Sequence, residues 1–145
     1  MKARNKILLL LAFLLILING YYYIIPLFKD ANEPLNHKTA EVFLHSKDLI
    51  YAFKEDEKKS TELYAGKILE VTGTIKEINH LNDRTTIILN NNDDSFGIIC
   101  DINPLENEKL NQLKINQKIS LKGICKGFLK DVILLNCSIE INPNE

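Results

Sequence analysis

The second half of the chain, from about Ile68 onward, restricts the fold more than any other part. Short runs of alternating apolar residues follow one another there, and one short helical pattern falls before the fourth run. Successive side chains of a strand point to opposite faces, so each run predicts a strand with one buried face. Five strands with a helix between the third and the fourth predict a mainly β protein: a five-stranded oligonucleotide/oligosaccharide-binding barrel, the OB-fold.

Each predicted strand has an inward and an outward face. A helix opened by Pro104 precedes the fourth strand, and Leu105, Leu110 and Leu113 are expected to point inward from it. A flat antiparallel sheet backed by helices is the alternative, and the position of this helix argues for the barrel. The strands are predicted at Leu69–Glu77, Thr85–Leu89, Phe96–Ile102, Lys118–Lys126 and Ile133–Ile141. The residues expected to face inward include Leu69, Val71, Gly73, Ile75, Ile119, Leu121, Gly123, Cys125, Ile133, Leu135, Cys137, Ile139 and Ile141.

The N-terminal stretch Ile7–Phe28 carries no charge and consists mostly of Leu, Ile, Phe and Tyr. As a helix, a stretch of this length reaches roughly 33 Å, enough for a hydrocarbon core of about 30 Å. The basic residues before Ile7 favour an inside N-terminus, so we predict an uncleaved single-pass anchor with the barrel outside. A cleaved signal peptide is the alternative, but Ile18-Asn19-Gly20 lacks the small residues of a cleavage site.

The segment between the anchor and the barrel divides into a polar part and a helical part. Ala40, Phe43, Leu44, Ile50 and Phe53 recur at helical spacing and predict an amphipathic helix of about four turns. A shorter helix is predicted over residues 57–64, and both are expected to pack on the barrel. The predicted organisation is therefore an anchor at residues 1–28, a polar stalk at 29–38, a helical segment at 39–66 and the barrel at 67–143.

Charge argues against a large contact with nucleic acid. All 19 acidic residues lie at or after Asp30, whereas three of the 18 basic residues precede Ile7. From Lys29 onward, 15 basic residues therefore face 19 acidic ones, a net charge of −4. A domain that neutralises many phosphates is expected to be basic.

Two groups of motifs resemble those of a known family. Tyr64-Ala65-Gly66-Lys67 leading into Val71-Thr72-Gly73 is similar to the entry of the tRNA_anti-like OB-fold family of bacterial envelope proteins. Lys122-Gly123-Ile124-Cys125-Lys126-Gly127, followed by Asp131-Val132 and Cys137, resembles the last hairpin of that family. The resemblance implies an OB-fold in the cell envelope, here on the outer side of the bacterial cytoplasmic membrane. Unlike the family's many lipoproteins, this chain has no cysteine directly after its apolar segment.

The three cysteines are all expected to point inward. Buried cysteines usually behave as small hydrophobes, although an exported domain also permits a disulfide. If the last hairpin turns at Phe128–Lys130, Cys137 lies opposite about Ser120, roughly 17 Å along the strand from Cys125 and too far for a disulfide. Strands three and five are neighbours in OB barrels, so Cys100 and Cys137 form the candidate disulfide.

Neither a metal, a cofactor nor a catalytic centre is predicted. The sequence has no C-x-x-C pair, and His37, His45 and His80 are dispersed. It also has no G-x-S-x-G elbow, phosphate-binding loop or dinucleotide-binding fingerprint. We therefore expect a non-enzymatic protein.

OB-folds bind ligands on the outer face of strands two and three and in the loops after strands one and four. We favour a binding or interaction module for an envelope protein or glycan, with Ile88, Ile99 and Leu129 as a small apolar patch. The alternative is a single-stranded nucleic-acid binder that uses the row Lys118, Lys122 and Lys126 together with Phe128. The predicted ligand-binding residues are His80, Arg84, Thr86, Ile88, Ile99, Phe128, Leu129 and Lys130.

Overall fold

The structure, a computed structural model, describes residues 12–22, 35–90 and 95–140. The chain divides into two compact units, Met1–Glu33 and Pro34–Glu145. In the first unit, residues 12–22 form a helix. Among the described residues, none of the helices combines the length and apolar character needed to span a membrane. The predicted anchor Ile7–Phe28 lies partly outside the described residues and stays a prediction.

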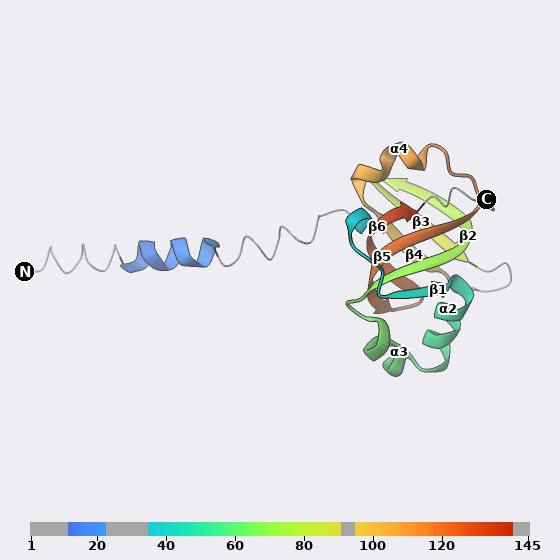
Figure 1. The fold of residues 1–145 in the computed structure, drawn as a ribbon, viewed down its shortest axis with the longest axis horizontal. Coiled ribbons are helices and arrows are strands. Elements are labelled where there is room, and N and C mark those ends of the chain that lie inside the picture. The colour runs from blue at the N-terminus through green and yellow to red at the C-terminus, as the bar shows by residue number, and fades with distance from the viewer. Residues whose placement is uncertain (1–11, 23–34, 91–94, 141–145) are drawn as a thin grey trace, which may run out of the picture. The chain divides into compact units, whose positions relative to one another are not determined.

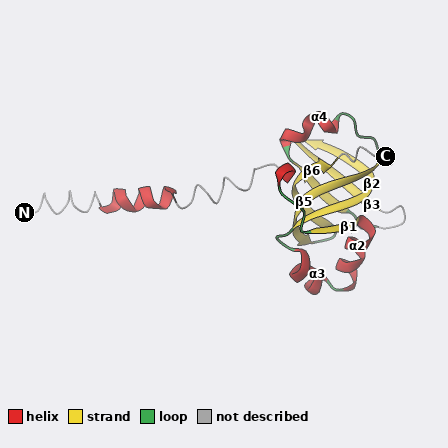
Figure 2. Cartoon of the chain, viewed as in Figure 1, coloured by secondary structure: helices red, strands yellow, loops and turns green. Residues whose placement is uncertain are grey.

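The second unit is built on a closed five-stranded barrel (Figures 1 and 2). Its strands follow one another in the order β2, β3, β4, β6, β5, and β5 pairs with β2 to close the barrel. Neighbouring strands are antiparallel except β4 and β6, which are parallel. This arrangement confirms the predicted OB-fold. The strands are β2 (Ile68–Leu81), β3 (Arg84–Asn90), β4 (Ile98–Ile102), β5 (Lys118–Phe128) and β6 (Val132–Glu140).

Helices cover both ends of the barrel. The helices α2 (Ser46–Glu55) and α3 (Glu57–Tyr64) lie at one end, where Leu49, Ile50 and Phe53 of α2 join the barrel core. The short elements η2 (Pro104–Glu106) and α4 (Asn107–Leu110) lie at the opposite end (Figure 1). They occupy the predicted position between the third and fourth barrel strands. Leu110 is buried as expected, whereas Leu105 is 72% exposed, because it follows Pro104 in a 3-10 turn that directs it outward.

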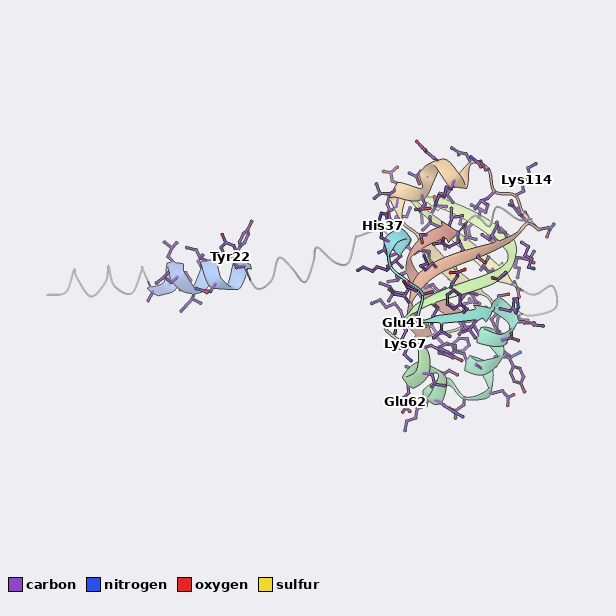
Figure 3. All side chains as sticks on the ribbon, in the orientation of Figure 1. Tyr22, His37, Glu41, Glu62, Lys67 and Lys114 are labelled. Atoms are coloured by element: carbon purple, nitrogen blue, oxygen red, sulfur yellow. The ribbon has the colours of Figure 1, made fainter. Side chains whose placement is uncertain are left out.

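The helical segment begins later than its apolar spacing predicts. A sixth strand, β1 (Val42–His45), precedes α2 and pairs in parallel with β2. A 3-10 turn, η1 (Leu35–His37), comes before it and contacts β6. We call residues 35–45 the strap. Glu41, which is labelled in Figure 3, joins the strap to β2. Its backbone N–H donates to the Ile68 carbonyl, and its side chain accepts from the Ile68 N–H at 3.1 Å. Phe43 and Leu44 therefore belong to a strand and not to a helix.

The inward face of β6 differs from the predicted one in its first half. Val132 and Leu134 are fully buried, whereas Ile133 and Leu135, which were expected inside, are only half-buried. The cause is an extra residue in β6 between Leu135 and Cys137, where Asn136 adopts a positive φ of 55°. Such a bulge reverses which side chains face the core. Beyond it, Cys137 and Ile139 point inward as predicted, and Ile141 lies outside the described residues.

Candidate binding surfaces of the barrel

The outer surface of β3 and β4 carries the central part of the predicted site. Ile88 of β3 and Ile99 of β4 are register partners, as are Thr86 and Asp101. All four are half-buried, while Ile87 and Cys100, which alternate with them, are fully buried. Partners in adjacent strands lie side by side on one face. The structure therefore brings Thr86, Ile88 and Ile99 together in one outward patch.

One end of this patch is closed by an ion pair. The guanidinium of Arg84 donates to the carboxylate of Asp101, and this hydrogen bond and the nearby negative charge raise the pKa of Arg84. Near the turn between β2 and β3, Nδ1 of His80 lies 2.8 Å from the Thr85 hydroxyl. Because Arg84 and Asp101 neutralise each other, the patch beside them gains no net charge from either residue.

The loop between β5 and β6 borders the other end of the patch. Asp131 accepts a hydrogen bond from the Gly97 backbone N–H at 2.6 Å, which holds this loop beside the start of β4. Leu129 is 85% exposed, and Lys130 is exposed as well. Phe128 is different: its ring stacks on Phe53 of α2 with 5.7 Å between centroids and is half-buried. It therefore packs the helices against the barrel instead of offering an open platform.

The predicted basic row on β5 is interrupted in its middle. Lys118 and Lys126 are exposed, but Lys122 is only 7% exposed. Its ammonium lies 2.7 Å from the carboxylate of Glu140 on β6. An ammonium that is buried against a carboxylate presents little positive potential to a phosphate outside. The structure does not assemble these three lysines into one exposed stripe.

The cysteines are three buried free thiols. Burial raises the pKa of Cys137 well above its ordinary value of 9.0, and a hydrogen bond with the Cys100 thiol raises it further. The predicted register was wrong, because Phe128 pairs with Val132 across a turn at residues 129–131, and this places Cys137 beside Gly123, only two positions from Cys125. The argument that excluded Cys125 from a disulfide therefore fails, and the bond between Cys100 and Cys137 stays a prediction.

Within the described ranges, no cluster of His, Cys, Asp or Glu could hold a metal ion.

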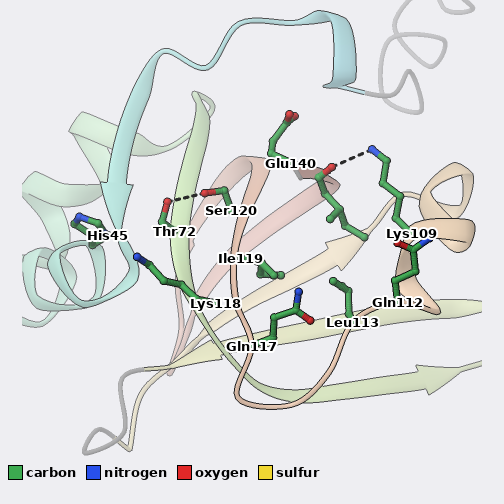
Figure 4. A pocket seen from close by; sticks show the side chains of 11 residues that line it. His45, Thr72, Lys109, Gln112, Leu113, Gln117, Lys118, Ile119, Ser120 and Glu140 are labelled. Carbon is green, nitrogen blue, oxygen red and sulfur yellow. Dashed lines mark hydrogen bonds between the residues drawn. The ribbon is translucent and has the colours of Figure 1, made fainter. Parts of the chain in front are cut away.

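A cavity of about 420 Å³ lies elsewhere on the barrel, between the ends of β5 and β6 and the segment that follows α4 (Figure 4). Hydroxyl, amide and charged side chains converge on it, and of these only Lys118 was among the predicted site residues, as part of the alternative nucleic-acid row. They include Thr72 and Ser120, whose hydroxyl oxygens lie 2.6 Å apart. The parity of β2 and β5 already placed these two side chains outside the barrel, but their meeting depends on the strand register. The other main lining residues are His45, Lys109, Gln112, Leu113, Gln117, Lys118, Ile119, Ile139 and Glu140.

Closed five-stranded topology, a helix before the fourth strand and an outward patch between two loops define this unit as an OB-fold domain. A model of the tRNA_anti-like family matches residues 1–139. The chain therefore belongs to the tRNA_anti-like family. No curated protein matches its sequence.

Solved structures share the fold at low sequence identity. A provisionally assigned nucleic acid-binding lipoprotein from Klebsiella pneumoniae is 14% identical, with a TM-score of 0.63 over 75% of this chain and all of that one. An OBody bound to hen egg-white lysozyme is 11% identical, with a TM-score of 0.45 over 53% of this chain and 81% of its own. An asparaginyl-tRNA synthetase from Pyrococcus horikoshii is 11% identical, with a TM-score of 0.41 over 53% of this chain and 20% of its own. At 14% identity, the likeness to the Klebsiella lipoprotein is one of fold.

Proposed function

We propose that this chain is a non-enzymatic binding module that contacts an envelope protein through the outer face of β3 and β4. In this proposal, its N-terminal segment holds it on the outer surface of the bacterial cytoplasmic membrane. The observation that carries the proposal is the outward pairing of Ile88 with Ile99, next to a loop that Asp131 holds at the start of β4 and that carries the highly exposed Leu129. Apolar side chains gathered between two loops are typical of a surface that another protein covers.

The charges around the patch support a protein partner over a nucleic acid. Beside the patch Arg84 is paired with Asp101, and elsewhere on the barrel Lys122, the middle residue of the predicted basic row, is paired with Glu140. Proteins that bind single strands combine a positive groove with exposed aromatic platforms. Phe128, the aromatic residue predicted for that role, is stacked on Phe53. A face without a strong positive field suits a partner that is recognised by shape and apolar contact.

Photo-crosslinking in the membrane-bound full-length chain tests this proposal. A photoreactive residue at position 88 is expected to give a discrete crosslinked product, because Ile88 lies at the centre of the proposed contact. The matched control is the same residue at position 126, since Lys126 is exposed on β5 outside the patch. Ile99→Asp should abolish the product from position 88, because it buries a charge in the contact. Equal products from positions 88 and 126, or none from position 88, would contradict the proposal.

A second candidate is binding to single-stranded nucleic acid, which the printed description of the Klebsiella lipoprotein favours by analogy. Titration with a single-stranded oligomer at several salt concentrations separates the two candidates. Phosphate binding shows an affinity that falls steeply as salt rises. We expect no measurable binding at low salt. A steep salt dependence that is weakened by Lys126→Gln would instead support the nucleic-acid function.

A further inference from the structure

One polar row crosses the outer surface of four adjacent strands. His45 of β1 is the register partner of Thr72 of β2, Thr72 is that of Ser120 of β5, and Ser120 is that of Glu140 of β6. Partners in neighbouring strands point to the same face of a sheet. Figure 4 shows these side chains along one side of the cavity. An imidazole, two hydroxyls and a carboxylate therefore line one wall.

The opposite wall comes from α4 and the segment that follows it. Lys109, Gln112, Leu113 and Gln117 line the cavity from that side (Figure 4). The volume of about 420 Å³ falls within the range of small-molecule sites. The two walls come from different parts of the chain, and a ligand in the cavity would contact both of them.

Two of the charged groups that line the cavity, Lys109 and Glu140, are paired within the protein, and Lys118 is a further cation of the lining. Lys109 lies 2.8 Å from Glu106 and also donates to the Ile139 carbonyl at 3.0 Å. Glu140 lies 2.7 Å from Lys122. An anion would meet the carboxylate of Glu140, which lines the cavity, while the buried Glu106 is paired with Lys109. A strongly charged ligand of either sign is therefore disfavoured.

The remaining groups suit a neutral ligand rich in hydroxyls. A hydroxyl both donates and accepts, so Thr72 and Ser120 keep hydrogen-bonding capacity after bonding to each other. The amide of Gln112 adds a donor and an acceptor, and Leu113 and Ile119 supply apolar surface. Sugar rings have this combination of hydroxyl edges and apolar C–H faces.

We propose that this cavity binds a neutral saccharide of one or two rings, at a site separate from the β3–β4 face. The polar row bonds the hydroxyls along one edge of the sugar, and Gln112 bonds them from the other side. Leu113 lies against an apolar face of the ring. The proposal does not depend on the protein partner, because the two surfaces share no residue.

Calorimetric titration of the full-length protein tests the site. The protein is held in lipid nanodiscs, so that no sugar headgroup of a detergent competes with the saccharide probes. The probes are glucose, N-acetylglucosamine, cellobiose and chitobiose, with inorganic phosphate and glucuronate as anionic comparisons. At least one neutral saccharide should bind saturably with one site per chain and more tightly than either anion. Gln112→Ala should weaken its binding about fivefold, the effect of losing one ordinary hydrogen bond.

Asn111→Ala is the matched control, because Asn111 is an exposed amide at the neighbouring position that does not line this cavity. It should leave the affinity unchanged, whereas Thr72→Val should lower it while keeping the shape of the side chain. Ile99→Asp should also leave it unchanged, which separates this site from the proposed protein contact. Three results would overturn the proposal: no binding by any neutral saccharide, tighter binding of phosphate, or equal losses in Gln112→Ala and Asn111→Ala.

Discussion

A single buried carboxylate fastens α4 to the barrel. Glu106 is 2% exposed, accepts a hydrogen bond from the Ile139 N–H at 3.2 Å and pairs with Lys109. Lys109 in turn donates to the Ile139 carbonyl. The two side chains thus satisfy both backbone groups of Ile139 as a neighbouring strand would. Buried backbone groups without a partner are costly, so this pair explains how two short turns can close one end of the barrel.

Replacement of Glu106 should therefore destabilise the fold. Glu106→Ala leaves the Ile139 N–H without its acceptor and Lys109 without its carboxylate, and we expect a loss of about 2–3 kcal/mol in the free energy of unfolding. Urea denaturation followed by circular dichroism measures this loss. Glu108→Ala, which removes an exposed carboxylate in the adjoining helix α4, should change it by less than about 0.5 kcal/mol. Equal effects of the two substitutions would show that Glu106 has no special role.

Because the Cys137 thiol is buried, we expect the stability of the reduced protein to depend on pH in the alkaline range. Burial favours the neutral thiol, so the pKa of Cys137 is higher in the folded state than in the unfolded state. The resulting stability is complete below the unfolded pKa and is lost as pH rises from there through the folded pKa. The urea midpoint should therefore fall as pH rises above about 9. Cys137→Ala should flatten this dependence more than Cys125→Ala does, and parallel curves for the two variants would contradict the assignment.

At the scale of elements, local alternation predicted the side-chain directions in those parts of the strands that contain no bulge. In β2 and β5, Val71 and Leu121 are buried as their parity requires. The bulge at Asn136 changes the parity of β6, and although asparagine adopts a positive φ more readily than most residues, one asparagine does not identify a bulge in a sequence. The strand β1 was missed for another reason: its apolar residues also fit helical spacing. Residues 42–45 are extended because they pair with residues 69–72 of β2, which are distant in the sequence.

The strap adds stability that the description of residues 29–38 as a polar stalk would not predict. Leu35 is only 1% exposed although it lies outside the core cluster of the barrel. Leu35→Ala should lower the free energy of unfolding by about 2–3 kcal/mol, because it removes a buried side chain. Leu105→Ala is the control, since Leu105 is largely exposed and should have little effect. If both variants unfold at the urea midpoint of the unsubstituted protein, the strap does not contribute to the folded unit.

At the scale of the whole molecule, the two binding surfaces differ in how far the sequence predicts them. Ile88 and Ile99 were placed on one face because adjacent strands and their parity are local features of an OB-fold. The saccharide cavity needs the register of β1, β2, β5 and β6 together with the position of Gln112. The register across four strands is set by bulges and by side-chain packing throughout the barrel. A short sequence motif therefore cannot predict this cavity.

The position of the whole protein in the cell depends on its N-terminal segment. Leu14 and Ile16 belong to the predicted span Ile7–Phe28, which carries no charge, so the unsubstituted chain should remain in the membrane pellet after alkaline carbonate extraction. Leu14→Arg combined with Ile16→Arg should release it, because each buried arginine costs about 2.5–3.5 kcal/mol on insertion scales. The control is a double arginine substitution at the exposed Tyr51 and Leu63 in the second unit, which should leave the chain in the pellet.

Protease added outside intact spheroplasts should digest the barrel, since the basic residues before Ile7 keep the N-terminus inside. If the barrel is protected in intact spheroplasts but digested after lysis, it lies on the inner side of the membrane. That result would contradict the predicted topology and exclude an envelope protein as the partner.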